Sequence, residues 1–326
     1  MTSTPDTPPA AADVDRPLPL AQLDPLQRAR REFLALVEKL RPDLHRYCAR
    51  MVGSVIDGED IVQDTLARGY YELSALKEPP ALRAWLFRIA HNRALDHLRR
   101  YERRMSEPLD PYSEDFIDES SDPSSLPLKQ QAVTLAVARF MQLAPTQRSC
   151  VILKDVLDFS LEEIGAQLEM SLEAVKAALH RGRLRLRDLS AANEAGEIPD
   201  TMPANISPSI QRYAELFNAR DWDGVRAMLI DDINLEVVDA SKRRGRKDVG
   251  VYFTNYGKRD NWYMVPAILE GRQGVAVLDS PNDRRARNFI ELTVSGDRIA
   301  RIRDFHHVPY FMSEARIDIF RPGSPP

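Results

Sequence analysis

The sequence of 326 residues contains little cysteine and no long hydrophobic run. Its two cysteines, Cys48 and Cys150, are far apart and belong to no CxxC or Cys/His cluster, which excludes a disulfide scaffold and a cysteine-based zinc site. No stretch approaches the roughly 18 apolar residues that a membrane span needs. We therefore expect a cytoplasmic protein with no membrane contact, no metal and no cofactor.

The chain also lacks an excess of positive charge. Its 45 Lys and Arg stand against 49 Asp and Glu, a balance that taken alone argues against a nucleic-acid partner. The charges are unevenly distributed, however. Residues 81–104 hold seven arginines and two acids, whereas residues 105–127 hold seven acids, four prolines and neither Lys nor Arg. The whole-chain balance therefore hides one basic segment and one acidic linker.

Hydrophobic periodicity divides the chain into three folded units. Apolar residues recur every three or four positions through residues 24–104 and again through 128–190, which predicts two helical domains. Beyond them, β-rich runs such as NFIELTV and RIARIRDF, joined by the turn Ser295-Gly296-Asp297, predict an α+β domain with a curved sheet. The boundaries that we predict are a disordered leader at 1–23, helical domains at 24–104 and 128–190, linkers at 105–127 and 191–206, and the α+β domain at 207–322.

A helix-turn-helix pattern is the most specific local motif. Ser160 and Glu163 form an S-x-x-E capping box that starts a short helix, and Ser171 can cap the helix that follows it. From Ser171 to Arg187 there are five Lys or Arg and one acid, so this second helix presents a basic face suited to DNA phosphates. The alternative is a helical hairpin whose basic face is merely solvated.

The arginine-rich segment 81–104 has a different composition. Aromatic, amide and imidazole side chains are interleaved with its arginines, a pattern suited to gripping unpaired bases. Trp85 fits a position in the core equally well, because a large indole at the stripe spacing usually packs inward. The preceding helix opens with Asp57, Glu59 and Asp60, which stabilise its N-terminus and, with Gln63 and Asp64, form a polar face for a basic partner.

These motifs together carry a family resemblance. DGEDIVQDTLARGYYEL, RAWLFRIAHNRALDHLRR, the acidic linker and LAPTQRSCVILKDVLDFSLEEIGAQLEMSLEAVKAALHRGRLRLRDL occur in this order, and residues 25–190 closely resemble bacterial RNA polymerase sigma factors of the extracytoplasmic function (ECF) class. Gly182 departs from the family pattern, which usually has a better helix former there.

The resemblance implies a sigma factor, which is not an enzyme. It would bind core RNA polymerase through the β′ clamp helices and the β flap, recognise promoter DNA and promote strand opening, and a separate anti-sigma factor could also bind it. Asp60, Gln63 and Asp64 would contact the clamp helices. The minus-ten element would be held by Trp85, Arg88, His91, Asn92, Arg93, His97, Arg99, Arg100 and Arg103. The minus-thirty-five element would be read by Ser171, Glu173, Ala174, Lys176, His180, Arg181, Arg183 and Arg187.

The last unit resembles the SnoaL-like branch of the nuclear-transport-factor-two-like fold, a cone whose curved sheet encloses a pocket. The resemblance implies that it modulates sigma activity, and we expect removal of the chain beyond about residue 200 to change transcription, in a direction that the sequence leaves open. The basic run SKRRGRK at 241–247 is expected to be a solvated hairpin turn. Candidate pocket residues for a small-molecule ligand are Tyr252, Tyr256, Trp262, Asp304 and His306.

Two other functions compete with this interpretation. The chain could be a ligand-responsive helix-turn-helix regulator that binds duplex DNA without polymerase, although this leaves the basic helix at 81–104 unexplained. It could instead be a cyclase or isomerase that uses Asp239, Asp304, His306 or His307 for acid-base chemistry, fused to a DNA-binding module.

Overall fold

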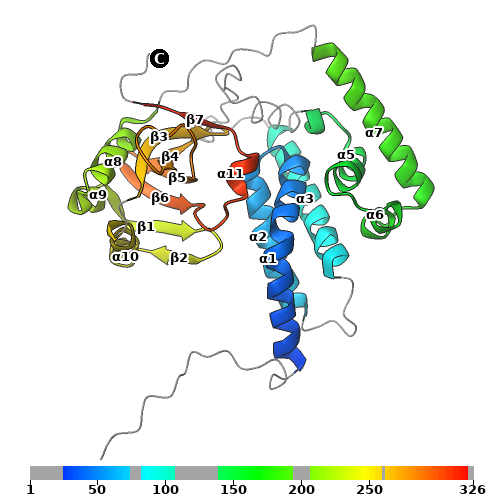
Figure 1. The fold of residues 1–326 in the computed structure, drawn as a ribbon, viewed down its shortest axis with the longest axis horizontal. Coiled ribbons are helices and arrows are strands. Elements are labelled where there is room, and N and C mark those ends of the chain that lie inside the picture. The colour runs from blue at the N-terminus through cyan, green and yellow to red at the C-terminus, as the bar shows by residue number, and fades with distance from the viewer. Residues whose placement is uncertain (1–24, 74–81, 107–138, 194–205, 259–260, 322–326) are drawn as a thin grey trace, which may run out of the picture.

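The computed structural model shows a helical body beside an α+β body (Figure 1). The leader predicted at 1–23 and most of both predicted linkers lie outside the described part of the chain. The helix that begins at Leu82 continues to Ser106, and the last helix of the helical body continues to Asn193, a few residues past the predicted domain boundaries. The structure describes residues 25–73, 82–106, 139–193, 206–258 and 261–321.

Three long helices form the first half of the helical body. They are α1 (Pro25–Val52), α2 (Val55–Leu73) and α3 (Leu82–Ser106). Their apolar stripes meet in a common core, where Leu44 and Val62 are fully buried. This burial is the main stabilising contribution, because each helix alone presents an apolar face that only packing can remove from water.

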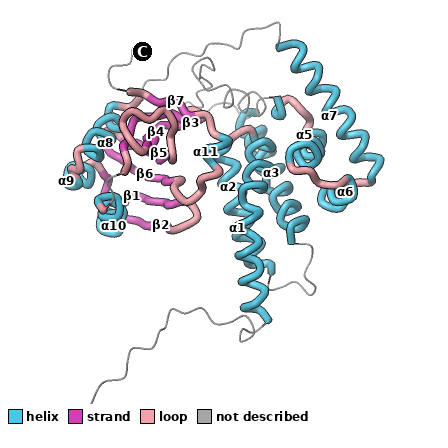
Figure 2. The backbone as a smooth tube through the Cα atoms, in the orientation of Figure 1, coloured by secondary structure: helices cyan, strands magenta, loops and turns pink. Residues whose placement is uncertain are grey.

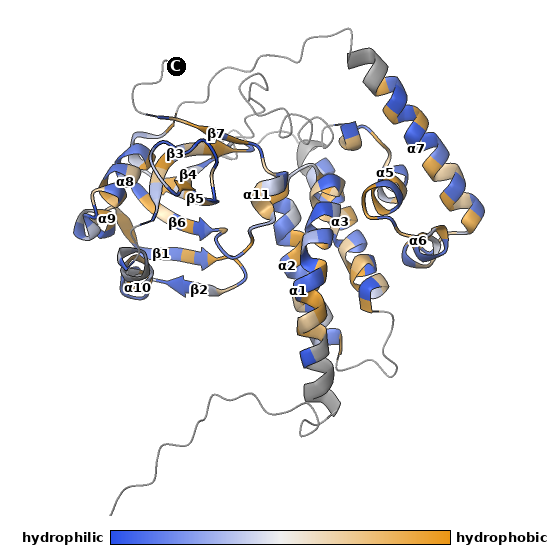
Figure 3. Cartoon of the chain, viewed as in Figure 1, coloured by the Kyte–Doolittle hydropathy of each residue, from blue (hydrophilic) through white to orange (hydrophobic). Residues whose placement is uncertain are grey.

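The second half contains shorter helices. They are α5 (Pro145–Val151), a π-helical turn η3 (Ile152–Val156), α6 (Leu161–Leu168) and α7 (Leu172–Asn193). Figure 3 shows hydrophobic and hydrophilic residues alternating along α7, as expected of a helix with one buried face.

The two halves share one hydrophobic core, although the sequence predicted separate domains. Phe87 of α3 packs edge-on against Phe159, with ring centroids 5.0 Å apart. The buried Arg148 guanidinium donates to the main-chain oxygens of Met141 and Leu143, and also to that of Met51 at the end of α1. Packing across these two contacts joins the halves into a single body.

The α+β body is built on a seven-stranded sheet with the order β2-β1-β6-β5-β4-β3-β7 (Figure 2). Strands β1 and β6 are parallel and the other neighbours are antiparallel. The strands are β1 (Leu229–Val237), β2 (Ser241–Arg244), β3 (Tyr263–Leu269), β4 (Arg272–Leu278), β5 (Asn288–Ser295), β6 (Arg298–Asp304) and β7 (Ile317–Ile319), and the helices are α8 (Pro208–Asn218), α9 (Trp222–Ala227), α10 (Arg246–Gly257) and α11 (Phe311–Glu314).

The two faces of the sheet have different neighbours. One face packs with α8, α9 and α10 into a core of its own. The other contributes Val265, Leu269 and Phe305 to a cluster that also contains Val55 and Ile56 from the start of α2. Figure 1 shows α11 against α1 and α2 at this seam. The α+β body therefore rests directly on the N-terminus of α2.

Candidate functional site

The acidic face of α2 lies at the seam between the two bodies. We call Asp60, Gln63 and Asp64 the docking face, because their spacing places them on one side of the helix. The carboxylate of Asp60 pairs with Arg303 of β6, although its side chain remains 52% exposed. Gln63 lines a groove of about 400 Å³ between α1, α2 and β1. Asp64 is exposed, and no described residue forms an ion pair with it.

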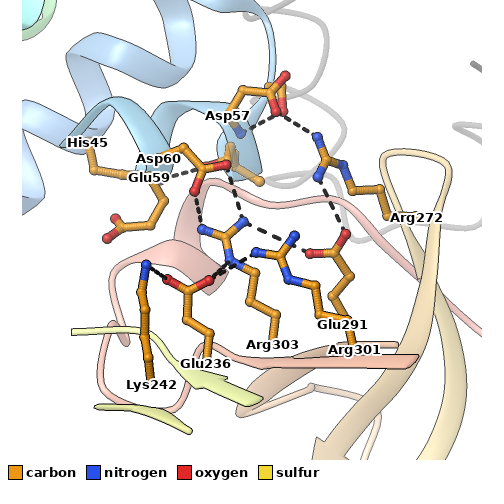
Figure 4. Close-up of polar contacts among 12 residues, drawn as sticks. His45, Asp57, Glu59, Asp60, Glu236, Lys242, Arg272, Glu291, Arg301 and Arg303 are labelled. Carbon is orange, nitrogen blue, oxygen red and sulfur yellow. Dashed lines mark hydrogen bonds and ion pairs between the residues drawn. The ribbon is translucent and has the colours of Figure 1, made fainter. Parts of the chain in front are cut away.

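Arg303 is the cation at the centre of the seam. Its side chain is only 2% exposed, and both terminal nitrogens reach Asp60, with Nη1 3.3 Å from Oδ2 (Figure 4). Its Nε lies 3.2 Å from Glu236 Oε2, and Nη1 lies 3.9 Å from Glu291 Oε2. A buried guanidinium needs such partners. Arg303 therefore pairs with Asp60 of the docking face as well as with two glutamates of its own sheet.

A second buried network crosses the seam at Arg41 of α1. Its guanidinium donates to Glu59 at 2.5 Å and to Asp239 of the α+β body at 2.6 Å. Tyr310 accepts from Arg41 at 2.6 Å and donates to Glu59 at 2.9 Å. Burial raises the pKa of Tyr310, so the phenol stays protonated and keeps donating. Glu59, fully buried, thus has a structural role, while Asp60 beside it points at Arg303.

Glu270 and Arg272 make a third contact, at the first turn of α2. Glu270 accepts the Val55 N–H at 2.9 Å and the Ser54 hydroxyl at 2.8 Å. Arg272 donates to Asp57 at 2.6 Å. Glu314, the last residue of α11, pairs with Arg50 and Arg46 of α1, at 2.7 and 3.3 Å.

The arginine-rich helix α3 is only partly free. Asn92, Arg100 and Arg103 are exposed, as a DNA surface requires. Three other members of the predicted minus-ten set lie near acidic residues of the chain at the long distance of 3.6 Å, and Arg100 Nε donates to the main-chain oxygen of Asp96 at 3.3 Å. Arg88 lies 3.6 Å from Glu169, His97 lies 3.6 Å from Asp57, Arg99 lies 3.6 Å from Asp96, and Arg93 is partly buried.

Two residues of the predicted minus-ten set, Trp85 and His91, make contacts inside the helical body. Trp85 is 7% exposed and belongs to the helical core, as its position on the apolar stripe of α3 allows. The His91 ring hydrogen bonds with Tyr47 at 2.8 Å and with Ser149 of α5 at 3.2 Å. Burial lowers the pKa of His91 to about 4, so the ring is neutral at neutral pH.

The helix-turn-helix motif is present as predicted. Ser160 accepts the Glu163 N–H at 3.1 Å, and Glu163 accepts the Ser160 N–H at 2.7 Å, which completes the capping box. The hydrogen bond to the Ser160 N–H lowers the pKa of Glu163. Ser171 caps α7 by accepting the Ala174 N–H at 3.2 Å. The exposed residues of the predicted set are Ser171, Glu173, Lys176, His180, Arg181, Arg183 and Arg187, while Ala174 is half-buried.

The departure at Gly182 has a steric reason. A Cβ placed on it would lie 2.7 Å from Val151 Cγ2 of α5, closer than real Cβ contacts come. Glycine therefore allows α5 and α7 to approach. Nearby, Arg183 of α7 pairs with Asp155 of η3 at 2.5 Å, so one basic group of α7 already has a partner within the helical body.

The candidate pocket residues of the α+β body form a buried polar cluster. Asp304, 1% exposed, accepts from Tyr252 at 2.9 Å and from Tyr256 at 3.0 Å. Its other oxygen accepts from Asn288 at 2.6 Å and from the His306 main-chain N–H at 3.0 Å. Burial followed by the nearby Asp304 charge raises the pKa of both tyrosines.

Trp262, the fifth candidate pocket residue, is 5% exposed and packs among other rings, 5.0 Å from Phe217 and 5.7 Å from Tyr256 between centroids. Asp239, offered as an acid-base residue, lies instead at the seam with Arg41.

No cluster of three or more His, Cys, Asp or Glu side chains suited to a metal occurs among the residues described. Within the same residues, no helix is long and apolar enough to cross a membrane.

Sequence reasoning missed the residues that join the two bodies. Arg303, Arg272 and Glu270 read as ordinary charged residues of strands and turns. One signal was available in the strand sequence RIARIRD. Its arginines alternate with apolar residues, but Arg303 stands next to Asp304 at the C-terminal end of β6, where residues on both faces of the sheet are buried. A buried arginine demands acids nearby, and α2 carries them.

Comparison with known proteins identifies the helical body. Residues 36–104 match the family described as Sigma-70 region 2, and residues 136–186 match Sigma-70, region 4. ECF RNA polymerase sigma factor SigG of Mycobacterium tuberculosis is 34% identical over 227 residues, 61% of this chain and 60% of that protein. ECF RNA polymerase sigma factor SigF of Caulobacter vibrioides is 34% identical over 167 residues, 50% of this chain and 87% of that protein.

Among solved structures, the extracytoplasmic function sigma factor SigJ of Mycobacterium tuberculosis covers 86% of this chain and 98% of its own, with 20% identity and a TM-score of 0.33. The present chain spans about 60% of the length of SigG, the first of the curated relatives named above. The α+β architecture expected for the last unit is the one observed, with a sheet backed by helices on one face.

Proposed function

Because this chain belongs to the ECF RNA polymerase sigma factors, we propose that it binds core RNA polymerase, recognises the minus-ten and minus-thirty-five elements of promoters and promotes strand opening in the cytoplasm. One observation carries this proposal. A single helical body presents the acidic face of α2, the exposed polar and arginine residues of α3 and the capped helix-turn-helix of α6 and α7.

The arrangement supplies the interactions that initiation needs. Opening DNA costs about 1.4 kcal/mol of stacking per base-pair step, which contacts available only to the open strand must offset. Asn92, Arg100 and Arg103 are exposed on α3 for such contacts. The exposed basic face of α7 can neutralise phosphates of duplex DNA, and its first turn can reach base edges in the major groove. Strand capture and duplex recognition are therefore assigned to separate helices.

We propose further that the α+β domain modulates the sigma factor by occupying its docking face. Arg303 engages both oxygens of Asp60, so a basic polymerase surface must displace this guanidinium to use the same carboxylate. Gln63 and Asp64 remain outside that ion pair. The seam thus favours competition between the α+β domain and polymerase for Asp60, one residue of the docking face. Release of the domain then raises sigma activity.

The hydrogen bonding of Asp304 favours modulation over catalysis. A carboxylate offers about four acceptor sites. In Asp304 these are matched by two tyrosine hydroxyls, an asparagine amide and a main-chain N–H. A carboxylate satisfied in this way is a poor general base, because taking a proton would break bonds already made. We therefore propose that the cluster holds β5, β6 and α10 together and that the chain is not an enzyme.

The proposal is tested by measuring the affinity for core polymerase of full-length variants. Gln63→Ala and Asp64→Ala should each weaken binding at least tenfold and reduce promoter-dependent transcripts, because each removes a polar contact with polymerase. Glu72→Gln is the matched control, since Glu72 is exposed on the same helix and pairs locally with Arg68 at 2.6 Å. Unchanged affinity in both alanine variants contradicts the docking face. Asp60→Ala is less informative, because it also frees Arg303.

A further inference from the structure

The turn that contacts α2 has an unfavourable residue in it. Glu270 and Gly271 join β3 to β4, where Leu269 pairs with Arg272, so the connection is a two-residue hairpin turn. Both central residues have positive φ, 51° at Glu270 and 75° at Gly271. Such a type I′ turn favours Asn-Gly, because asparagine tolerates the left-handed conformation and glutamate does so poorly. Something other than the hairpin itself explains glutamate at this position.

The Glu270 carboxylate is used by α2. Its two oxygens lie 2.9 and 3.1 Å from the Val55 nitrogen, the first amide of the helix, and one of them also accepts from the Ser54 hydroxyl. The Ser54 oxygen, in turn, accepts the Asp57 N–H at 3.1 Å. A capping side chain accepts from the second or third amide of a helix, so Ser54 serves Asp57, and the acceptor for the Val55 N–H comes from the other body. A carboxylate at this end also complements the helix dipole.

The next residue but one completes the contact. Arg272 donates to Asp57 at 2.6 Å, on the same first turn of α2. Residues 270–272 therefore present an anion to the helix amides and a cation to the helix carboxylate, with glycine between them to permit the turn. This hairpin tip, residues 270–272, is called the clasp below.

We infer that the clasp is a detachable N-cap of α2 that holds the α+β domain on the docking face. Glutamate at position 270 makes the hairpin turn less stable but supplies this cap. This inference rests on the proposed function, because it assigns the regulation of the same face. When the domain leaves, the Val55 amide returns to water and Asp57 loses Arg272. When it docks, the first turn of α2 is capped and Asp60 meets Arg303. Capping of α2 and occupation of its docking face are thus one event.

The test is Glu270→Asn in the full chain, with hydrogen exchange of the Val55 and Ile56 amides as the readout. Asparagine suits the turn but is one methylene shorter, so the hairpin should be at least as stable to heat while the cap is lost. Exchange of these amides should then accelerate about tenfold or more, as expected when a hydrogen bond to a charged group is removed. Affinity for core polymerase should rise in parallel.

Asp297→Asn is the matched control, because Asp297 occupies the β5–β6 turn beside Gly296 and its side chain makes no contact with α2 in the described residues. Glu270→Gln keeps the length and the strained turn, so its exchange should accelerate less. Unchanged exchange of the Val55 and Ile56 amides in Glu270→Asn overturns the clasp. Accelerated exchange with unchanged polymerase affinity supports the clasp and contradicts the proposed function instead.

Discussion

Replacing Glu314 by glutamine should release the α+β domain without weakening either body. The Glu314 side chain is 11% exposed and its carboxylate pairs with Arg50 and Arg46, both on α1. The contacts it makes therefore exist only while the domain is docked. The Arg50 side chain is itself 10% exposed at the seam, so it would lose its counter-charge there and regain full hydration on release.

The size of the effect follows from this burial. Removing the charged partner of a largely buried arginine costs about 2 kcal/mol, which corresponds to roughly a 30-fold shift toward the released state. If the docked state dominates, the apparent Kd for core polymerase equals the intrinsic Kd divided by the released fraction. We therefore expect Glu314→Gln to tighten polymerase binding by up to about 30-fold and to increase promoter-dependent transcription.

The assay is a fluorescence titration of labelled full-length protein with core polymerase. Glu215→Gln serves as the control, because Glu215 is exposed and pairs with Arg212 within α8, at 3.4 Å. An apparent Kd for Glu314→Gln within twofold of the parent protein would refute the reasoning, since it would mean that docking does not compete with polymerase. A weaker Kd would refute it more strongly.

Two further predictions concern the helical body. Burial lowers the pKa of His91 to about 4, below its ordinary 6.5, so the unfolded chain binds a proton at a higher pH than the folded chain does. The free energy of unfolding should therefore be greatest above pH 6.5 and decline toward pH 4, by up to about 3 kcal/mol from this residue. Thermal unfolding of His91→Gln should show a flatter pH profile, and an unchanged profile contradicts the assignment. Gly182→Ala should destabilise by about 1 to 3 kcal/mol, because the new Cβ meets Val151; denaturant unfolding checks this, and a neutral result means that α5 and α7 separate easily.

Local sequence signals predicted much of this fold. The capping box at Ser160 starts α6 as expected, because its hydrogen bonds join residues three apart. The runs NFIELTV and RIARIRDF became β5 and β6, and the turn at Gly296 joins these two strands. Local signals of this kind can be recognised in the sequence without knowing which other elements each helix or strand packs against.

Contacts between distant segments were not predicted. The basic run at 241–247, expected as a solvated turn, begins with the edge strand β2, and Lys242 pairs with Glu236 of β1 at 3.1 Å. The sequence left Trp85 open between DNA contact and the core, and the structure buries it in the helical core at 7% exposure. The seam itself depends on Arg303 and Asp60, which are 243 positions apart and have no local pattern in common.

The sheet that carries Arg303 and the helix that carries Asp60 belong to one polypeptide. The two are therefore made in a one-to-one ratio at every level of expression, and dilution cannot separate them as it separates two free subunits. Contacts that would be too weak to join two independent proteins can be sufficient between domains tethered in one chain. A signal that shifts the equilibrium between the docked and released α+β domain must then act on the seam itself, because neither gene dosage nor differential degradation can change the stoichiometry.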